Sequence, residues 1–311
     1  MLLRDCIVSS GSKAGWLGGV LLLIPFLLPL WAGALGRTAE QIENLLHVPA
    51  FFALTVCLVA ILPARLAQAK ARWLALALAV LCAGLLEVVQ PRFGRTAELI
   101  DFGMGFLGSA SAFCFLWGMS LQGLHRWIAF SSCLVLAVLS LLPLGCVVVD
   151  QRHARRDFPL IASFESWPEL GRWSFHGVHA SRSADHVKTG RYSLRVEVDD
   201  TGGYPSFFLD DEARDWSSLK RLCTDLFVEG AQPVRLWIRV DDLPGNPPYA
   251  ERFQVLHNLA PGFHSLCLDT TDLRTEGGRP LDLRHIHAFG IFFDGAESGD
   301  VVYFDSIRGI Q

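Results

Sequence analysis

Long apolar runs fill the first half of the chain, and short alternating segments fill the second. Five runs come close to the 20 or so residues with which a helix crosses about 30 Å of hydrocarbon. They are Trp16–Leu35, a segment from about Leu45 to Leu62, Trp73–Val89, Phe102–Leu121 and Trp127–Val149. Tryptophans lie near the ends of these runs, as in the aromatic belts of membrane interfaces. The pattern predicts a five-span membrane α-helical bundle in residues 1–149.

The second half carries short segments rich in β-branched and aromatic residues, separated by Gly, Pro, Asn and Asp. Such segments predict antiparallel strands with turns between them. The candidate strands are Tyr192–Val198, Leu222–Val228, Val234–Val240, Phe263–Leu268, Phe289–Phe293 and Val301–Ile307. We therefore expect an all-β jelly-roll sandwich in residues 158–311, with residues 150–157 as a polar juxtamembrane linker.

Composition supports this division. The 311 residues are 51% hydrophobic, and their mean hydropathy of +0.34 is too high for an ordinary soluble protein. Residues 1–149 carry a formal charge of +3, whereas the remainder carries −7. An acidic soluble half argues against nucleic acid as a partner. The sequence contains no glycine-rich nucleotide motif, no HExxH and no GxSxG.

The basic residues of the short loops predict the orientation. Arg4, Lys13, Arg65, Lys70, Arg72 and Arg126 fall on one side of the predicted spans. This side is expected to be the cytoplasm, so the amino terminus lies inside and the β half lies outside the cytoplasmic membrane. The arginines of the linker argue for the opposite orientation. A signal peptide cleaved near Ala34 is the alternative interpretation of the first span.

Polar side chains gather at the outer ends of three predicted spans. His47 opens the second span, Glu87 and Gln90 close the third, and Asp101 opens the fourth, with Arg95 in the intervening loop. Ionisable groups beside hydrocarbon are costly, so these five residues form a candidate membrane-face site. Each has a simpler interpretation, because Asp101 also fits a helix cap, Glu87 an ion pair with Arg95, and His47 an interfacial side chain.

The order of these residues carries a resemblance. The segments HVPAFFAL, EVVQ and FGR, followed by an aspartate that opens a glycine-rich helix, resemble the VanZ-like family of bacterial membrane proteins over residues 43–120. The chain departs from the family pattern at Glu43-Asn44, where the family has Asp-Lys, and at Gly105, where it has Asn. The resemblance implies a cell-envelope context and carries over His47, Glu87, Gln90, Arg95 and Asp101 as motif positions, without implying a reaction.

The second half has a resemblance of its own. FESWPELGRW, TGRYSLRV, APGFHSLCLD and VVYFDSIR resemble jelly-roll carbohydrate-binding modules and galactose-binding-like domains over residues 160–310. That resemblance implies a structural Ca²⁺ held by Glu165 and Asp305 with loop carbonyls, a ligand set that suits this ion. The alternative is that both carboxylates are solvated or paired with basic residues.

Within VRLWIRV, strand alternation places Arg235, Trp237 and Arg239 on one face. A tryptophan flanked by arginines is a candidate glycan platform, although it also fits packing under a loop. Trp167 and Trp173 are expected in the core.

The cysteines of the second half, Cys223 and Cys267, both lie in predicted strands. A disulfide and two free thiols both remain open for them.

Two functions follow from these observations. The first is a bacterial envelope protein without enzymatic activity, which spans the lipid bilayer and displays a glycan-binding domain in surface polysaccharide, cell-wall or glycopeptide-resistance biology. The alternative is a membrane enzyme or carrier that acts on a lipid-linked envelope precursor through His47, Glu87, Arg95 and Asp101.

Overall fold

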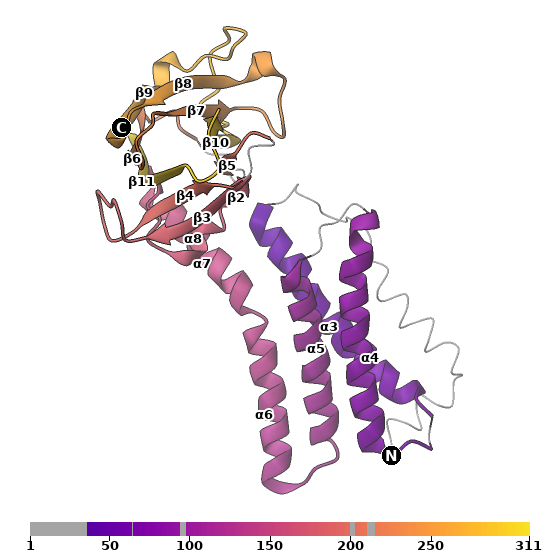
Figure 1. Cartoon of the computed structure of the whole chain (residues 1–311). Coiled ribbons are helices and arrows are strands. Elements are labelled where there is room, and N and C mark those ends of the chain that lie inside the picture. Colours follow the sequence, from indigo (N-terminus) through magenta and orange to yellow (C-terminus); the bar gives the residue numbers. More distant parts are fainter. Residues whose placement is uncertain (1–35, 64, 94–97, 200–202, 210–214) are drawn as a thin grey trace. The chain divides into compact units, whose positions relative to one another are not determined.

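The computed structural model describes residues 36–63, 65–93, 98–199, 203–209 and 215–311 (Figure 1). The chain divides into two compact units, Met1–Val148 and Val149–Gln311, which are described separately. The predicted first span, Trp16–Leu35, and the loop residue Arg95 lie outside the described residues.

The first unit is helical. Its elements are α3 (Gly36–Ile61), α4 (Gln68–Val89), the short 3-10 helix η2 (Gln90–Phe93), α5 (Leu99–Gly118) and α6 (Gly123–Leu139), and α7 (Leu142–Asp157) continues into the second unit. Within the described part of the chain, four segments are long and apolar enough to cross a membrane: Gly36–Ile61, Gln68–Phe93, Leu99–Gly118 and Gly123–Asp157. These helices fit a membrane-associated protein.

Two helical predictions need correction. Helix α3 begins at Gly36, well before the predicted start near Leu45, so the buried Asn44 lies within the helix. The predicted linker 150–157 is the continuation of α7. Its polar composition resembles a linker, but Asp150 is 3% exposed and accepts two hydrogen bonds from the Arg172 guanidinium, a contact within the second unit.

Small residues allow the helices of the first unit to approach closely. A side chain at Gly108 of α5 would meet the backbone carbonyl of Val48 in α3, and one at Gly105 would meet Phe51 and Ala83. Helix α4 presents a fully buried alanine stripe at four-residue spacing: Ala71, Ala75, Ala79 and Ala83. Close backbone contact of this kind is how helices associate where burial from water gives no driving force.

The second unit is an antiparallel sandwich of two sheets. The six-stranded sheet has the order β3-β4-β11-β6-β9, with β1 paired to β11, and the five-stranded sheet has the order β2-β5-β10-β7-β8. The strands are β1 (Leu160–Ala162), β2 (Trp173–His176), β3 (Val178–Ser183), β4 (Ser193–Val198), β5 (Ser206–Leu209), β6 (Arg221–Val228), β7 (Val234–Asp241), β8 (Phe253–Leu259), β9 (Gly262–Asp269), β10 (Ala288–Asp294) and β11 (Val301–Ile310). A short helix, α8 (Trp167–Leu170), follows β1.

The inner faces of the two sheets bury one apolar core, in which Phe207, Phe289, Phe293 and Phe304 are among the largest fully buried side chains. Cys223 and Cys267 lie opposite each other on β6 and β9 and form a disulfide. The sequence left a disulfide and two free thiols open, and the structure contains the disulfide.

Candidate functional site

The outer face of the five-stranded sheet carries a row of large side chains. On β7, Val234, Leu236, Ile238 and Val240 point into the core and are at most 5% exposed. Arg235, Trp237 and Arg239 therefore lie on the opposite, outer face, as their alternation predicts. The core side of the strand fixes this orientation, because a shift of one residue would expose every core side chain.

Strand register places Trp237 in the middle of an apolar row. Phe292 of β10 lies directly opposite Trp237 on one side, and Leu256 of β8 lies opposite it on the other. The ring of Phe208 from β5 contacts Phe292 edge-on, with the ring centroids 4.7 Å apart. Phe292 and Trp237 are partly exposed, and Leu256 is 37% exposed. We call Phe208, Phe292, Trp237 and Leu256 the aromatic row.

Polar pairs lie along both sides of the aromatic row. On one side, Arg235 and Asp294 lie opposite each other and form an ion pair. Asn258 of β8 is the next neighbour of Arg235 across the sheet. The row thus combines apolar rings with hydrogen-bonding groups at its edge.

On the other side, Arg239 is nearly buried and donates to both carboxylate oxygens of Asp241, at 3.0 and 2.6 Å. Its guanidinium lies 5.9 Å from the ring centroids of both Phe208 and Phe292. Burial raises the pKa of Asp241, and the hydrogen bonds from Arg239 act in the opposite direction. Arg239 therefore packs beside the rings of Phe208 and Phe292. Of the two arginines on the outer face of β7, Arg235 is the exposed one.

Phe208 and Phe292 were not predicted as site residues from the sequence. The alternation within β10 already separates Phe292 from Phe289, Ile291 and Phe293, which are in the core. Alternation within one strand cannot show that β10 lies between β5 and β7, which is what places Phe292 beside Trp237 and Phe208. Gly290 completes the arrangement, because the Phe208 ring occupies the space that a side chain at that position would need.

Trp167 is not in the core, contrary to the sequence-based expectation, whereas Trp173 is buried there. Trp167 starts helix α8 and is 70% exposed. The Arg182 guanidinium lies 5.3 Å from the centroid of its ring and 4.0 Å from that of Tyr192. The attraction between the Arg182 guanidinium and the ring favours this exposed position of the Trp167 side chain.

The structure brings Glu165 and Asp305, from opposite ends of the second unit, to one loop. Glu165 Oε1 accepts from the backbone N–H groups of Arg191 and Tyr192, at 2.7 and 3.0 Å. Asp305 Oδ2 accepts from the N–H groups of Lys188 and Thr189, the latter at 2.6 Å. Both carboxylates therefore hold residues 188–192.

Asp305 is 2% exposed, and among the described residues its Oδ1 has no hydrogen-bond partner. Burial raises the pKa of Asp305, and the neighbouring carboxylates of Asp225 and Glu165 raise it further, against the backbone hydrogen bonds. A buried carboxylate oxygen of this kind is a position that a cation would stabilise. Asp305 Oδ1 is therefore the atom on which the Ca²⁺ expectation rests, because Asp305 Oδ2 and Glu165 Oε1 already accept from backbone N–H groups.

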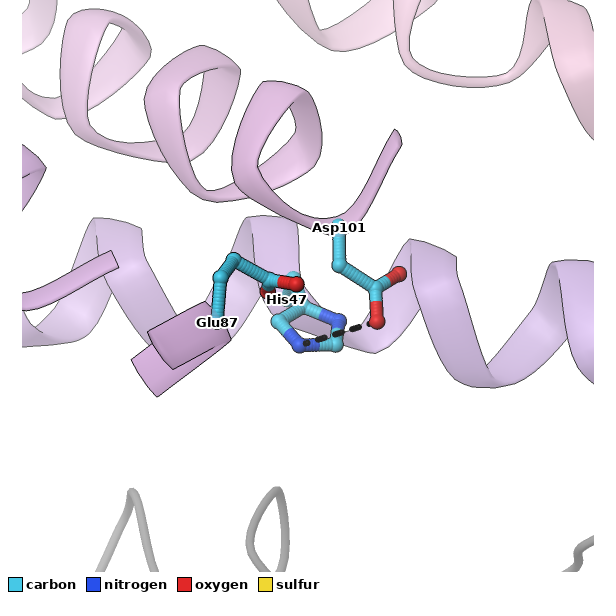
Figure 2. Close-up of side chains that lie close together, drawn as sticks. All are labelled: His47, Glu87 and Asp101. Carbon is cyan, nitrogen blue, oxygen red and sulfur yellow. Dashed lines mark ion pairs between the residues drawn. The ribbon is translucent and has the colours of Figure 1, made fainter. Parts of the chain in front are cut away.

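Three polar side chains meet inside the first unit: His47 from α3, Glu87 from α4 and Asp101 from α5 (Figure 2). One potential ligand atom from each lies within 4.8 Å of the others. His47 Nε2 is 3.9 Å from Asp101 Oδ2, and both side chains are 2% exposed. The fold therefore brings together three of the five predicted membrane-face residues.

Each of these three side chains also contacts a neighbouring group. His47 Nδ1 is 3.2 Å from the carbonyl oxygen of Asn44, and Glu87 Oε2 accepts from the N–H of Glu98 at 2.8 Å. In the amide orientation that suits its surroundings, Asn44 donates to Asp101 Oδ1 at 2.8 Å. The N-cap of α5 is Glu98, so Asp101 lies in the first turn and does not cap the helix.

Gln90 is fully buried at the start of η2, directly after α4.

No family model matches the chain, and neither does any curated protein. The C-terminal half resembles the β-sandwich folds of carbohydrate-binding modules. A family 11 carbohydrate-binding module from Clostridium thermocellum, solved with a β-1,3-1,4-mixed-linked tetrasaccharide, is 19% identical with a TM-score of 0.38, and the match covers 49% of this chain and 94% of that one.

Two further solved structures are similar. An exo-β-agarase is 17% identical with a TM-score of 0.40, and the match covers 49% of this chain and 24% of the agarase. A xylan-binding domain of family 22 is 15% identical with a TM-score of 0.32, over 47% of this chain and 90% of that domain.

Proposed function

We propose that the chain is an integral membrane protein of the bacterial envelope whose β-sandwich binds a glycan on the outer face of its five-stranded sheet. The observation that carries the proposal is the aromatic row with its polar edges. Four long apolar helices support the membrane anchor. The VanZ-like order of polar residues in them supports the envelope context. In this proposal the amino terminus is cytoplasmic and the β-sandwich is outside, which reporter fusions at Gln311 would test.

The chemistry of the row suits a sugar. A pyranose ring presents C–H groups on its face and hydroxyls on its edge, so it needs an apolar platform beside donors and acceptors. Trp237 and Phe292 supply adjacent ring surface, and Arg235, Asn258 and Asp294 supply polar groups along one side. Sites that combine apolar walls with a few placed polar groups are typical of small-ligand binding.

The test is a titration of the full chain in lipid nanodiscs with soluble β-glucan, xylan and agarose oligosaccharides. We expect saturable binding of at least one of them. Trp237→Ala should weaken this binding about 30-fold, which corresponds to about 2 kcal/mol for a central tryptophan. Trp167→Ala is the matched control, since it removes a more exposed tryptophan whose ring lies beside Arg182 of the other sheet. Equal affinity of both variants and the unsubstituted protein would refute the site.

We propose in addition that Glu165 and Asp305 hold a structural Ca²⁺ with loop carbonyl oxygens. The ion would neutralise the two carboxylates and fix residues 188–192 against β11. Millimolar Ca²⁺ should raise the melting temperature of the protein, since a ligand that binds only the folded state stabilises it. Asp305→Asn should remove the increase, whereas Asp294→Asn, on the other sheet, should retain it. An unchanged melting temperature with Ca²⁺ would refute this proposal.

A second candidate function rests on the meeting of His47, Glu87 and Asp101. In an enzyme or carrier for a lipid-linked envelope precursor, Glu87 or His47 would act as acid or base, and Arg95 would bind a phosphate. Complementation of a deletion strain separates the candidates. If Glu87→Gln, Arg95→Ala and Asp101→Asn all restore the phenotype fully, this function is excluded.

A further inference from the structure

The arrangement of His47, Glu87 and Asp101 has the features of a metal centre. From this geometry we infer that the three side chains bind one divalent first-row transition-metal ion between α3, α4 and α5. Metal binding is measured without any sugar or lipid substrate, so it can fail or succeed independently of both proposed functions.

The distances are close to those of a ligand set. Zinc lies about 2.0–2.2 Å from nitrogen and oxygen ligands, so two ligand atoms on opposite sides of one ion are at most about 4.4 Å apart. His47 Nε2 and Asp101 Oδ2 satisfy this limit at 3.9 Å. The three potential ligand atoms lie within 4.8 Å of one another, and a small rotation about the side-chain bonds of Glu87 would complete the set.

The hydrogen bonding of His47 fixes which nitrogen faces the centre. The Asn44 carbonyl can only accept, so His47 Nδ1 carries the hydrogen in that contact. In the neutral ring, Nε2 then presents its lone pair toward Asp101. Histidines that bind metals almost always donate their other N–H to a carbonyl or a carboxylate in this way.

The two carboxylates are held by outer partners as well. Asn44, which orients His47 through its backbone, also orients Asp101 through its side-chain amide. Glu87 is held by the backbone N–H of Glu98, one residue before α5 begins. A centre whose ligands are all fixed by a surrounding layer is pre-organised for an ion, and such layers are worth about 10–100-fold in metal affinity.

Charge and ligand type determine the class of ion. An imidazole nitrogen and two carboxylate oxygens are ligand atoms that together attract a divalent cation. A nitrogen ligand disfavours Ca²⁺ and Mg²⁺, whereas mixed nitrogen and oxygen ligands suit Zn²⁺, Mn²⁺ and Fe²⁺. Three protein ligands also leave room for water or substrate, as in catalytic zinc centres.

The experiment uses the full chain in detergent, stripped with a chelator and titrated with Zn²⁺ and Mn²⁺ against a chromophoric competitor. We expect one ion per chain to be bound by this centre. His47→Gln, Glu87→Gln and Asp101→Asn should each lower the affinity at least about 10-fold, and Asn44→Ala should lower it about 10–100-fold. His125→Gln, an exposed histidine at the start of α6, is the matched control and should retain full affinity.

Co²⁺ loaded into the unsubstituted protein gives a readout that does not depend on the folding of variants. We expect visible d–d absorption with the intensity of a four- or five-coordinate ion bound by nitrogen and oxygen, displaced by one equivalent of Zn²⁺. Absence of this spectrum overturns the inference. Equal metal affinity of the unsubstituted protein and all four variants also overturns it, because the ion would then be bound elsewhere.

Discussion

Asp225 offers the most direct quantitative test of how the β-sandwich is held together. It lies on β6 and is 2% exposed. Lys188 Nζ contacts its Oδ1 at 2.6 Å, and an Arg308 guanidinium nitrogen contacts its Oδ2 at 2.5 Å. Ser265 donates to the same carboxylate. Asp225 thus joins the loop that carries Lys188 to strands β9 and β11.

The perturbation is Asp225→Asn, which removes the charge and retains the size. Burial raises the pKa of Asp225, but hydrogen bonds from Lys188, Ser265 and Arg308 outweigh this and lower it from 3.8 to about 2. The difference corresponds to about 2 kcal/mol of folding free energy, since one pKa unit is about 1.4 kcal/mol. Lys188 is 47% exposed, so high salt should reduce the effect.

The sign follows from the lowered pKa. The carboxylate stabilises the folded state above pH 3.8, and this contribution is lost as the pH falls toward 2. Urea unfolding of the β-sandwich at several pH values should show the substituted protein about 2 kcal/mol less stable at pH 6, with the gap closing below pH 3.8. A gap of constant size across this range, or no gap at pH 6, would refute the reasoning.

Three further perturbations follow from the structure. Reduction of the Cys223–Cys267 disulfide, or its replacement by serines, should destabilise the sandwich by up to about 4 kcal/mol in urea unfolding, because the bond spans 44 residues. Burial lowers the pKa of His257 below 6.5, so the folded state disfavours the protonated ring and the protein should lose stability as the pH falls below 6.5. His257→Gln should remove this part of the pH dependence of the melting temperature. Gly108→Ala should force α5 away from an α3 carbonyl and lower the melting temperature in detergent, whereas Gly103→Ala, with open space around it, should not.

Local pattern was enough for much of the secondary structure. Apolar runs predicted helices in the first half because a continuous apolar segment of that length has few other stable forms. Alternation predicted which face of β7 carries Trp237, because Leu236 and Ile238 must reach the core. It did not predict that α7 runs through residues 150–157, since the partner of Asp150 is Arg172, well beyond the helix.

The candidate sites could be predicted from the sequence only in part. His47, Glu87 and Asp101 were selected because polar groups are unusual beside apolar runs, but their distances depend on how closely α3 and α5 pack at Gly108. Phe292 was missed as a neighbour of Trp237, because only the strand order sets β10 beside β7.

By itself the sequence determined an apolar helical half, an all-β half and the inward or outward direction of side chains along each strand, because these depend on periodicities within a few residues of chain. The tertiary structure alone decided the contacts between distant segments: the disulfide of Cys223 with Cys267, the meeting of Glu165 and Asp305 at one loop, and the aromatic row. Such contacts depend on strand order, register and helix packing, which minimise the exposed apolar surface of a whole unit and have no local signature.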